Sequence, residues 1–135
     1  MSFGDSVENS ILDEVFGGTA YGAIGTLYVA VSTASFGEAG TGGSEPSGGE
    51  YARVVVVNNG TNWSAAVSGT KQNAVAFTFA TATSNWGTIA HMGIFGTALP
   101  TTGTFVAYGT LDTAKVVTTN DVFRFSVGSL TITLT

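Results

Sequence analysis

The chain contains 135 residues, the length of about one domain, and no cysteine, which excludes disulfides and thiolate metal sites. Only 10% of the residues are charged, and the net charge is −5. The four Lys and Arg residues are scattered, so nucleic-acid binding, which needs clustered cations to neutralise phosphates, is excluded as an expected function.

Residues 1–18 are predicted to form an N-terminal helical arm. Asp5 and Glu8 have the outline of a capping box, with Ser6 as a competing N-cap, and two glycines stop the helix at 17–18. Apolar residues follow with helical spacing at Val7, Ile11, Leu12, Val15 and Phe16. A helix of about 10–12 residues is too short to be stable alone. Its apolar stripe is therefore expected to dock on the β domain or on a neighbouring subunit, and Ile11 and Val15 are candidate contact residues.

The acidic residues are concentrated toward the N-terminus. Residues 1–50 contain seven Asp or Glu side chains and no Lys or Arg, whereas all four cations come later in the chain. This asymmetry indicates a negative N-terminal face, which either meets a basic partner surface or is an ordinary solvated edge.

After the arm, most of the chain alternates apolar and polar residues with the period of a β-strand. Thr26–Ser32 is a clear example, and Tyr51–Val57 is followed by Asn58-Asn59-Gly60, a turn signal that favours a tight hairpin. Further strands are predicted at 75–79, 88–95, 104–111, 122–127 and 130–135, with short pieces near 63–67 and 115–118. The last strand is expected inside a sheet. About eight or nine short strands predict an all-β protein, a single antiparallel β-sandwich or jelly-roll-like domain over residues 1–135.

Residues 33–50 are predicted to form a long, flexible, glycine-rich loop. The segment holds six glycines, and Phe36 is nearly its only apolar side chain. A loop of this length inside a compact domain is usually functional or mobile. We expect Phe36 to act as an apolar anchor against a partner. The candidate contact carboxylates are Glu38, Glu45 and Glu50; Ca²⁺ binding by them is a weaker alternative, because their spacing matches no EF-hand.

The sequence contains no constellation typical of an active site. His91 is the only histidine, and its apolar neighbours favour a structural role. A zinc site would need several His or Cys ligands, and the glycine-rich loop lacks the ending of a phosphate-binding loop. No stretch is long and apolar enough to span a membrane, and the first residues do not resemble a secretory signal. We therefore expect a non-enzymatic protein with no cofactor, no metal, no small-molecule substrate and no membrane contact.

Large aromatic and basic side chains are the remaining candidates for a binding surface. Four large aromatic side chains could either form a stacking platform for sugar rings or fill the core, and we favour the core. They are Trp63, Trp86, Tyr51 and Tyr108. Arg53 and Arg124 lie within strand patterns between apolar residues. This placement predicts half-buried guanidinium groups paired with carboxylates of another strand or another subunit.

The most specific motif of the chain is Ser44-Glu45-Pro46-Ser47-Gly48-Gly49-Glu50-Tyr51-Ala52-Arg53. With further blocks at 27–33, 58–64, 77–82, 86–95 and 123–132, it resembles a family of short tailed-bacteriophage virion structural proteins. The resemblance implies a virion protein without catalytic residues. Members of this kind are often labelled tail-fibre proteins, while similar-looking small β proteins are cement or decoration proteins on capsids.

Two functions are consistent with this resemblance. The first is a capsid cement or decoration protein, a homotrimer on the capsid exterior that bridges and stabilises major capsid protein subunits through residues 1–18 and 33–50. The alternative is a tail-fibre or tail-tip component, either a receptor- or glycan-binding module or a connecting one, although the chain shows no fibrous repeat. Both place the protein in the virion after synthesis in the host cytoplasm. A third hypothesis, a cell-wall hydrolase, lacks candidate residues.

Overall fold

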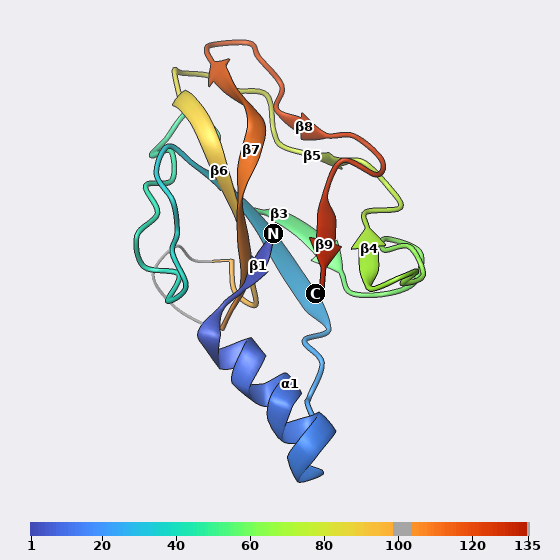
Figure 1. Cartoon of the computed structure of the whole chain (residues 1–135). Coiled ribbons are helices and arrows are strands. Elements are labelled where there is room, and N and C mark those ends of the chain that lie inside the picture. The colour runs from blue at the N-terminus through green and yellow to red at the C-terminus, as the bar shows by residue number, and fades with distance from the viewer. Residues whose placement is uncertain (99–103, 135) are drawn as a thin grey trace.

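The computed structural model describes residues 1–98 and 104–134, and most of its secondary structure is β (Figure 1). Every strand pairing in these residues is antiparallel. The prediction of an all-β, sandwich-like fold is confirmed. In chain order the elements are β1 (Ser2–Phe3), α1 (Asp5–Gly17), β2 (Thr26–Ser32), β3 (Val54–Val57), β4 (Thr70–Gln72), β5 (Phe77–Thr78), β6 (Gly87–Phe95), β7 (Phe105–Val117), β8 (Arg124–Phe125) and β9 (Thr131–Thr133).

The strands form one five-stranded sheet and two ribbons. The order in the sheet is β1-β7-β6-β2-β3, while β4 pairs with β9 and β5 pairs with β8. The ribbons lie on one side of the sheet in Figure 1, which gives the molecule two layers. The core lies between the layers, where Val29, Ile89, Met92 and Ile94 of the sheet meet Trp63, Phe77, Phe79, Phe125 and Leu130 of the ribbons and their turns.

The other face of the sheet is covered by residues 33–50, the segment between β2 and β3. Phe36 of this segment packs against Phe95 and Phe105 of the sheet, with ring centroids 5.2 and 6.3 Å away. Gly93 makes room for the ring, since a Cβ at that position would lie 2.9 Å from an atom of Phe36. The sheet is therefore buried on both faces here, which explains why the last four residues of β2 are all buried.

Most of the predicted strands are found, with changes at their boundaries, but the piece predicted near 63–67 forms only isolated bridges, Trp63 with Asn73 and Val67 with Thr70. β2 has the predicted bounds, and the pieces predicted at 104–111 and 115–118 are one long strand, β7. The final strand was expected inside a sheet, but β9 belongs to a two-stranded ribbon, and Thr135 lies outside the described residues. Neither β1 nor β4 was predicted, because two or three residues are too short to show a period of two.

The hairpin predicted at Asn58-Asn59-Gly60 is wrong. β3 pairs with β2, which precedes it by more than twenty residues, and not with the segment that follows the turn. The side chain of Asn59 accepts hydrogen bonds from the backbone N–H groups of Thr61 and Asn62, both at 3.0 Å. This Asx turn sends the chain toward Trp63 in the second layer.

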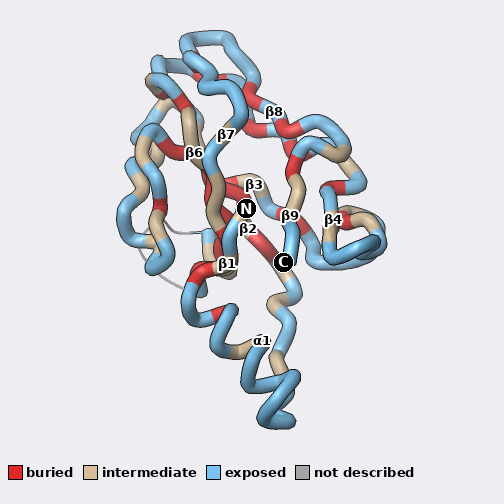
Figure 2. The backbone as a smooth tube through the Cα atoms, in the orientation of Figure 1, coloured by how far each residue is buried: buried red, intermediate tan, exposed pale blue. Residues whose placement is uncertain are grey.

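The helix α1 ends as predicted and begins differently. Gly18 terminates it in the left-handed conformation, with φ of 68°. The predicted capping box is wrong, because Gly4 is the N-cap residue and forms no side-chain cap bond. α1 projects from the body of the molecule, and Val7 is its only buried residue (Figures 1 and 2). Within the described residues, no helix has the length and apolar character needed to cross a membrane.

Candidate interaction surfaces

Glu45 and Arg53 form a buried ion pair behind the sheet. Arg53 donates from Nε and Nη2 to the two carboxylate oxygens of Glu45, at 3.0 and 2.7 Å, and the two side chains are only 1% and 8% exposed. Arg53 Nη1 donates to the carbonyl of Thr97 at 3.0 Å, and the guanidinium lies 3.7 Å from the ring centroid of Phe95. The buried charge is thus neutralised and hydrogen-bonded. The carboxylate partner predicted for Arg53 is confirmed, and it comes from the same chain.

Tyr51 completes this network. Its hydroxyl donates to Glu45 Oε1 at 2.6 Å and accepts from the backbone N–H of Val31 in β2 at 3.1 Å. Burial, and then the adjacent Glu45 carboxylate, raise the pKa of Tyr51 far above its ordinary value, so the hydroxyl stays protonated. The Glu, Tyr and Arg of the most specific sequence motif therefore bind one another and fasten the 33–50 segment to the sheet.

Gly49 of the same motif lies so close to neighbouring side chains that there is no room for a Cβ atom. The indole Nε1 of Trp86 donates to the carbonyl of Gly49 at 2.9 Å. A Cβ on Gly49 would lie 2.3 Å from Ser84 Oγ, and its φ of 62° is one that favours glycine. The motif thus has a structural explanation, since each of these side chains or glycines holds the segment against its own chain.

The contact roles expected within residues 33–50 change accordingly. Phe36 is only 3% exposed, so it is a core residue rather than an anchor for a partner. The Glu45 carboxylate is occupied by Arg53, while Glu38 and Glu50 are exposed. Among the residues that the structure describes, no three His, Asp or Glu side chains are grouped as metal ligands.

The tryptophans lie in the core, as the favoured interpretation predicted. Trp63 and Trp86 are 2% and 4% exposed, so they form no stacking platform on the surface. His91 is half-buried, with Nδ1 3.3 Å from the hydroxyl of Thr110. The half-buried, paired state predicted for Arg124 is wrong: its side chain is exposed, and it has no ion-pair partner within the described residues.

The apolar stripe of α1 is a surface without a partner among the residues that the structure describes. Leu12, Val15 and Phe16 are 55%, 64% and 84% exposed, and Ile11 is half-buried. Of the two docking partners expected for the stripe, the β domain takes only Val7. α1 also carries four carboxylates and no Lys or Arg. It is therefore an acidic amphipathic helix whose apolar face lies in solvent.

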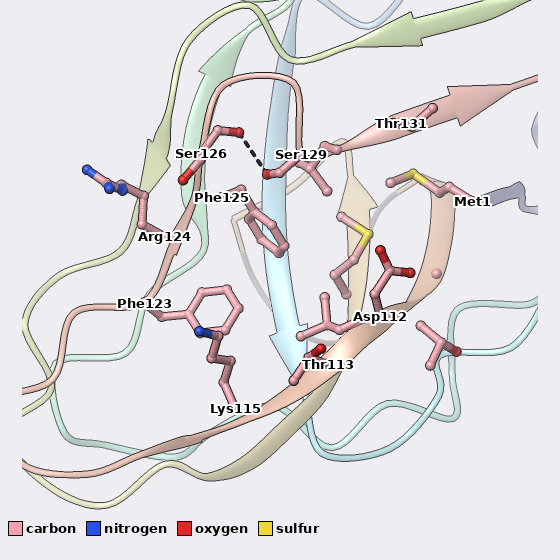
Figure 3. Close-up of a pocket in the computed structure, with 15 residues that line it drawn as sticks. Met1, Asp112, Thr113, Lys115, Phe123, Arg124, Phe125, Ser126, Ser129 and Thr131 are labelled. Carbon is pink, nitrogen blue, oxygen red and sulfur yellow. Dashed lines mark hydrogen bonds between the residues drawn. The ribbon is translucent and has the colours of Figure 1, made fainter.

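A groove lies between β7 and the segment 121–131 of the second layer (Figure 3). β1 pairs with β7 at Ala107 and Tyr108 and Met1 lies beside Gly109, so among the described residues this edge of β7 has no strand partner beyond Gly109. The first part of the groove has a volume of about 490 Å³, and it continues into a second hollow of about 420 Å³. We call this surface the β7 groove; its walls are β7 from Gly109 to Val117 and the segment 121–131, with Met92 at its base.

The base of the β7 groove is closed by buried core side chains, and exposed apolar and cationic side chains lie along its border. Phe123 and Phe125 turn their rings into it, as Figure 3 shows, whereas Arg124 between them points away from the rings. Lys115 and Arg124 line both hollows. This groove was not predicted from the sequence; the available signal was the alternation of Phe123, Arg124 and Phe125, which places the guanidinium on the face opposite the core.

Comparison with protein families places the chain among the virion structural proteins of short-tailed bacteriophages. The matching family is described as podophage GP4 fiber I protein gp80, and the match covers residues 2–133. The chain belongs to this family. No curated protein matches the chain significantly. The resemblance to phage virion proteins that the sequence motifs carry is confirmed, and the family's description points to a fibre rather than to capsid cement.

Proposed function

We propose that the protein is a non-enzymatic fibre component of the phage particle, and that it connects protein subunits rather than binding a sugar receptor. The observation that carries this proposal is the family match over residues 2–133, whose description is that of a fiber protein. It favours the tail-fibre alternative over the capsid cement role that was expected first.

The surface supports a connecting role over a sugar-binding one. Sugar recognition commonly relies on exposed aromatic faces, and both tryptophans are buried. Protein contact relies on apolar side chains at the surface, and α1 presents Leu12, Val15 and Phe16 there. The buried polar groups of the Glu45 network hold the fold together.

The capsid cement hypothesis loses one of its supports. It relied on residues 33–50 as an adaptable loop that reaches neighbouring capsid subunits. In the structure this segment covers its own sheet, and Phe36 and Glu45 bind residues of the same chain. Within residues 1–98 and 104–134, the arm is left as the element that reaches away from the body (Figure 1).

The number of copies per particle tests the proposal. We expect quantitative mass spectrometry of purified particles to give far fewer copies of this chain than of the major capsid protein. Antibody labelling in the electron microscope is expected to place it on the tail or its fibres. A copy number near that of the capsid subunits, with label over the capsid, would overturn the fibre proposal in favour of cement.

A further inference from the structure

Two surfaces of the chain lack a partner, and their properties are complementary. The stripe of α1 is apolar and acidic, and the β7 groove is bordered by the exposed apolar side chains of Val116 and Val122 and by the exposed cations Lys115 and Arg124. We propose that α1 of one copy docks in the β7 groove of a second copy. This inference rests on the proposed connecting function and identifies the surfaces that make the connection.

The positions of the exposed cations favour the β7 groove as the binding site for α1. Arg53 is neutralised inside the molecule, and Lys71 is half-buried with its ammonium bonded to the carbonyl of Ser64. Lys115 and Arg124 are thus the two exposed cationic side chains of the chain, and both border the groove. A second α1 is a poor occupant of the stripe, because both helices carry only carboxylates and would repel each other.

The acids of the groove do not cancel this attraction. Asp112 lines only the first hollow and Asp121 only the second, whereas both cations line the two hollows together. The Asp121 carboxylate accepts hydrogen bonds from the backbone N–H and the hydroxyl of Thr118, at 2.8 and 3.0 Å. These bonds lower the pKa of Asp121, and they hold its charge in its own turn.

The lengths of the two surfaces agree. α1 has 13 residues and is about 20 Å long at the rise of an α-helix. The open edge of β7 between Gly109 and Val117 is roughly 25 Å long at the rise of a strand. Helices that dock in grooves use apolar residues spaced by three or four positions, and Leu12, Val15 and Phe16 have this spacing.

The topology prevents a helix from reaching the groove of its own chain. β1 runs antiparallel to β7, and Phe3 is already paired with Ala107, on the far side of Tyr108 from the groove. The backbone N–H of Gly4 then donates to the carbonyl of Val106 at 2.9 Å. The chain therefore runs away from Gly109, and so from the groove, before α1 begins. The contact must therefore form between copies, and because it joins two different surfaces it produces a reciprocal dimer, a larger ring or an open chain of copies.

Sedimentation of the purified full-length chain tests the inference. We expect the wild type to self-associate, and we expect both Leu12→Ser/Phe16→Ser on α1 and Lys115→Glu/Arg124→Glu in the groove to raise the dissociation constant by roughly tenfold or more. All four side chains are exposed, so each variant is expected to fold, which circular dichroism and thermal unfolding would verify.

Exchanging the charges of two facing side chains distinguishes a direct contact between α1 and the groove from a general effect of altered net charge. Glu8 lies on the helix face of Leu12 and Val15, so Glu8→Arg is expected to weaken association, and Glu8→Arg combined with Lys115→Glu to restore it. Asp13→Arg makes the same charge change on another face of α1 and is the matched control, expected to leave association unchanged.

Three results would overturn the inference. A wild-type chain that is monomeric at every concentration would do so, as would groove variants that associate like the wild type. Dissociation by the groove variants but not by the α1 variants would mean that something other than α1 occupies the groove. None of these bears on the number of copies per particle, so failure here leaves the fibre proposal standing, and a capsid-like copy number with intact self-association would overturn only that proposal.

Discussion

The carboxylate of Glu45 accepts hydrogen bonds from two residues that follow it closely in the chain, Tyr51 and Arg53. One residue thus links the covering segment, the strand that follows it, and through Tyr51 the backbone of β2. Buried charges that are paired and fully bonded contribute little net stability over an apolar core, but they are very sensitive to the loss of one partner. The network therefore makes a definite prediction for each of its members.

Glu45→Gln is expected to lower the free energy of unfolding by about 3–5 kcal/mol, because it leaves the Arg53 guanidinium buried without a counter-charge. Urea unfolding measures this loss. Glu38→Gln changes an exposed carboxylate of the same segment and is the control, with an expected change within about 0.5 kcal/mol. Similar small losses for both variants would contradict the energetic role that we assign to the ion pair.

Tyr51 is expected to make the fold sensitive to alkali. The pKa of its hydroxyl is raised in the folded state, so the folded chain keeps this proton when the unfolded chain loses it. The resulting stability is fully present below pH about 10, the unfolded pKa, and is lost as the pH rises beyond it toward the folded pKa. Thermal unfolding followed from about pH 8 to pH 12 would show this loss in the wild type.

Tyr51→Phe removes the ionisable group and should flatten this dependence on pH. The variant is less stable at neutral pH, because the Glu45 carboxylate loses a donor, so the comparison concerns the slope with pH and not the absolute melting temperature. A variant that loses stability above pH about 10 as steeply as the wild type would show that other groups cause the alkaline unfolding.

At the scale of elements, the segment 33–50 acts as a layer of the fold. It contains no strand, yet Phe36 supplies a buried ring to the back of the sheet. Phe36→Ala is expected to lower the free energy of unfolding by about 3–5 kcal/mol through lost burial and the cavity left behind.

Phe16→Ala offers a matched control for this loss, because Phe16 is 84% exposed at the end of α1. The same substitution there is expected to change stability by no more than about 0.5 kcal/mol, as measured by urea unfolding at concentrations where the chain is monomeric. If Phe36→Ala were as harmless as Phe16→Ala, the 33–50 segment would not be part of the core.

The elements that could be predicted from the sequence are those with a strong period. The arm and β2 are examples, since five apolar residues with helical spacing and seven alternating residues specify their structure locally. The role of residues 33–50 could not be predicted in this way. Glycine-rich composition is typical of both a mobile loop and a tightly packed covering segment, and the difference lies in contacts with β2, β6 and β7 that are distant in sequence.

The same limit applies to the candidate surfaces. Ile11 and Val15 were found because a helix places them on one stripe. The β7 groove was missed because its walls come from two segments whose proximity depends on the fold, and Arg124 was misplaced because its apolar neighbours suggested burial. Alternation along β8 exposes a residue between two buried ones, which neighbour composition alone does not reveal.

At the scale of the whole molecule, the protein has a core rich in aromatic rings and a surface with few charges. Both tryptophans belong to the core, where Trp63 packs edge-on against Phe77 and Trp86 against Tyr51. We expect weak quenching of tryptophan fluorescence by acrylamide until the chain unfolds. Purified host polysaccharide is expected to leave the emission spectrum unchanged, and quenching or a spectral shift on its addition would contradict the connecting role in favour of glycan binding.

The pairing of β1 with β7 has a consequence for synthesis. Ser2 pairs with Tyr108, so β1 cannot pair until β7, which lies more than one hundred residues later in the chain, has been synthesised. Such long-range pairings are slow to form, because a long chain must close before any contact compensates for its lost entropy. A nascent or truncated chain that lacks β7 lacks the strand that pairs with β1, and α1 follows β1 after a single residue. The arm is therefore oriented only on complete chains, which delays its use as a contact surface until the body of the protein has folded.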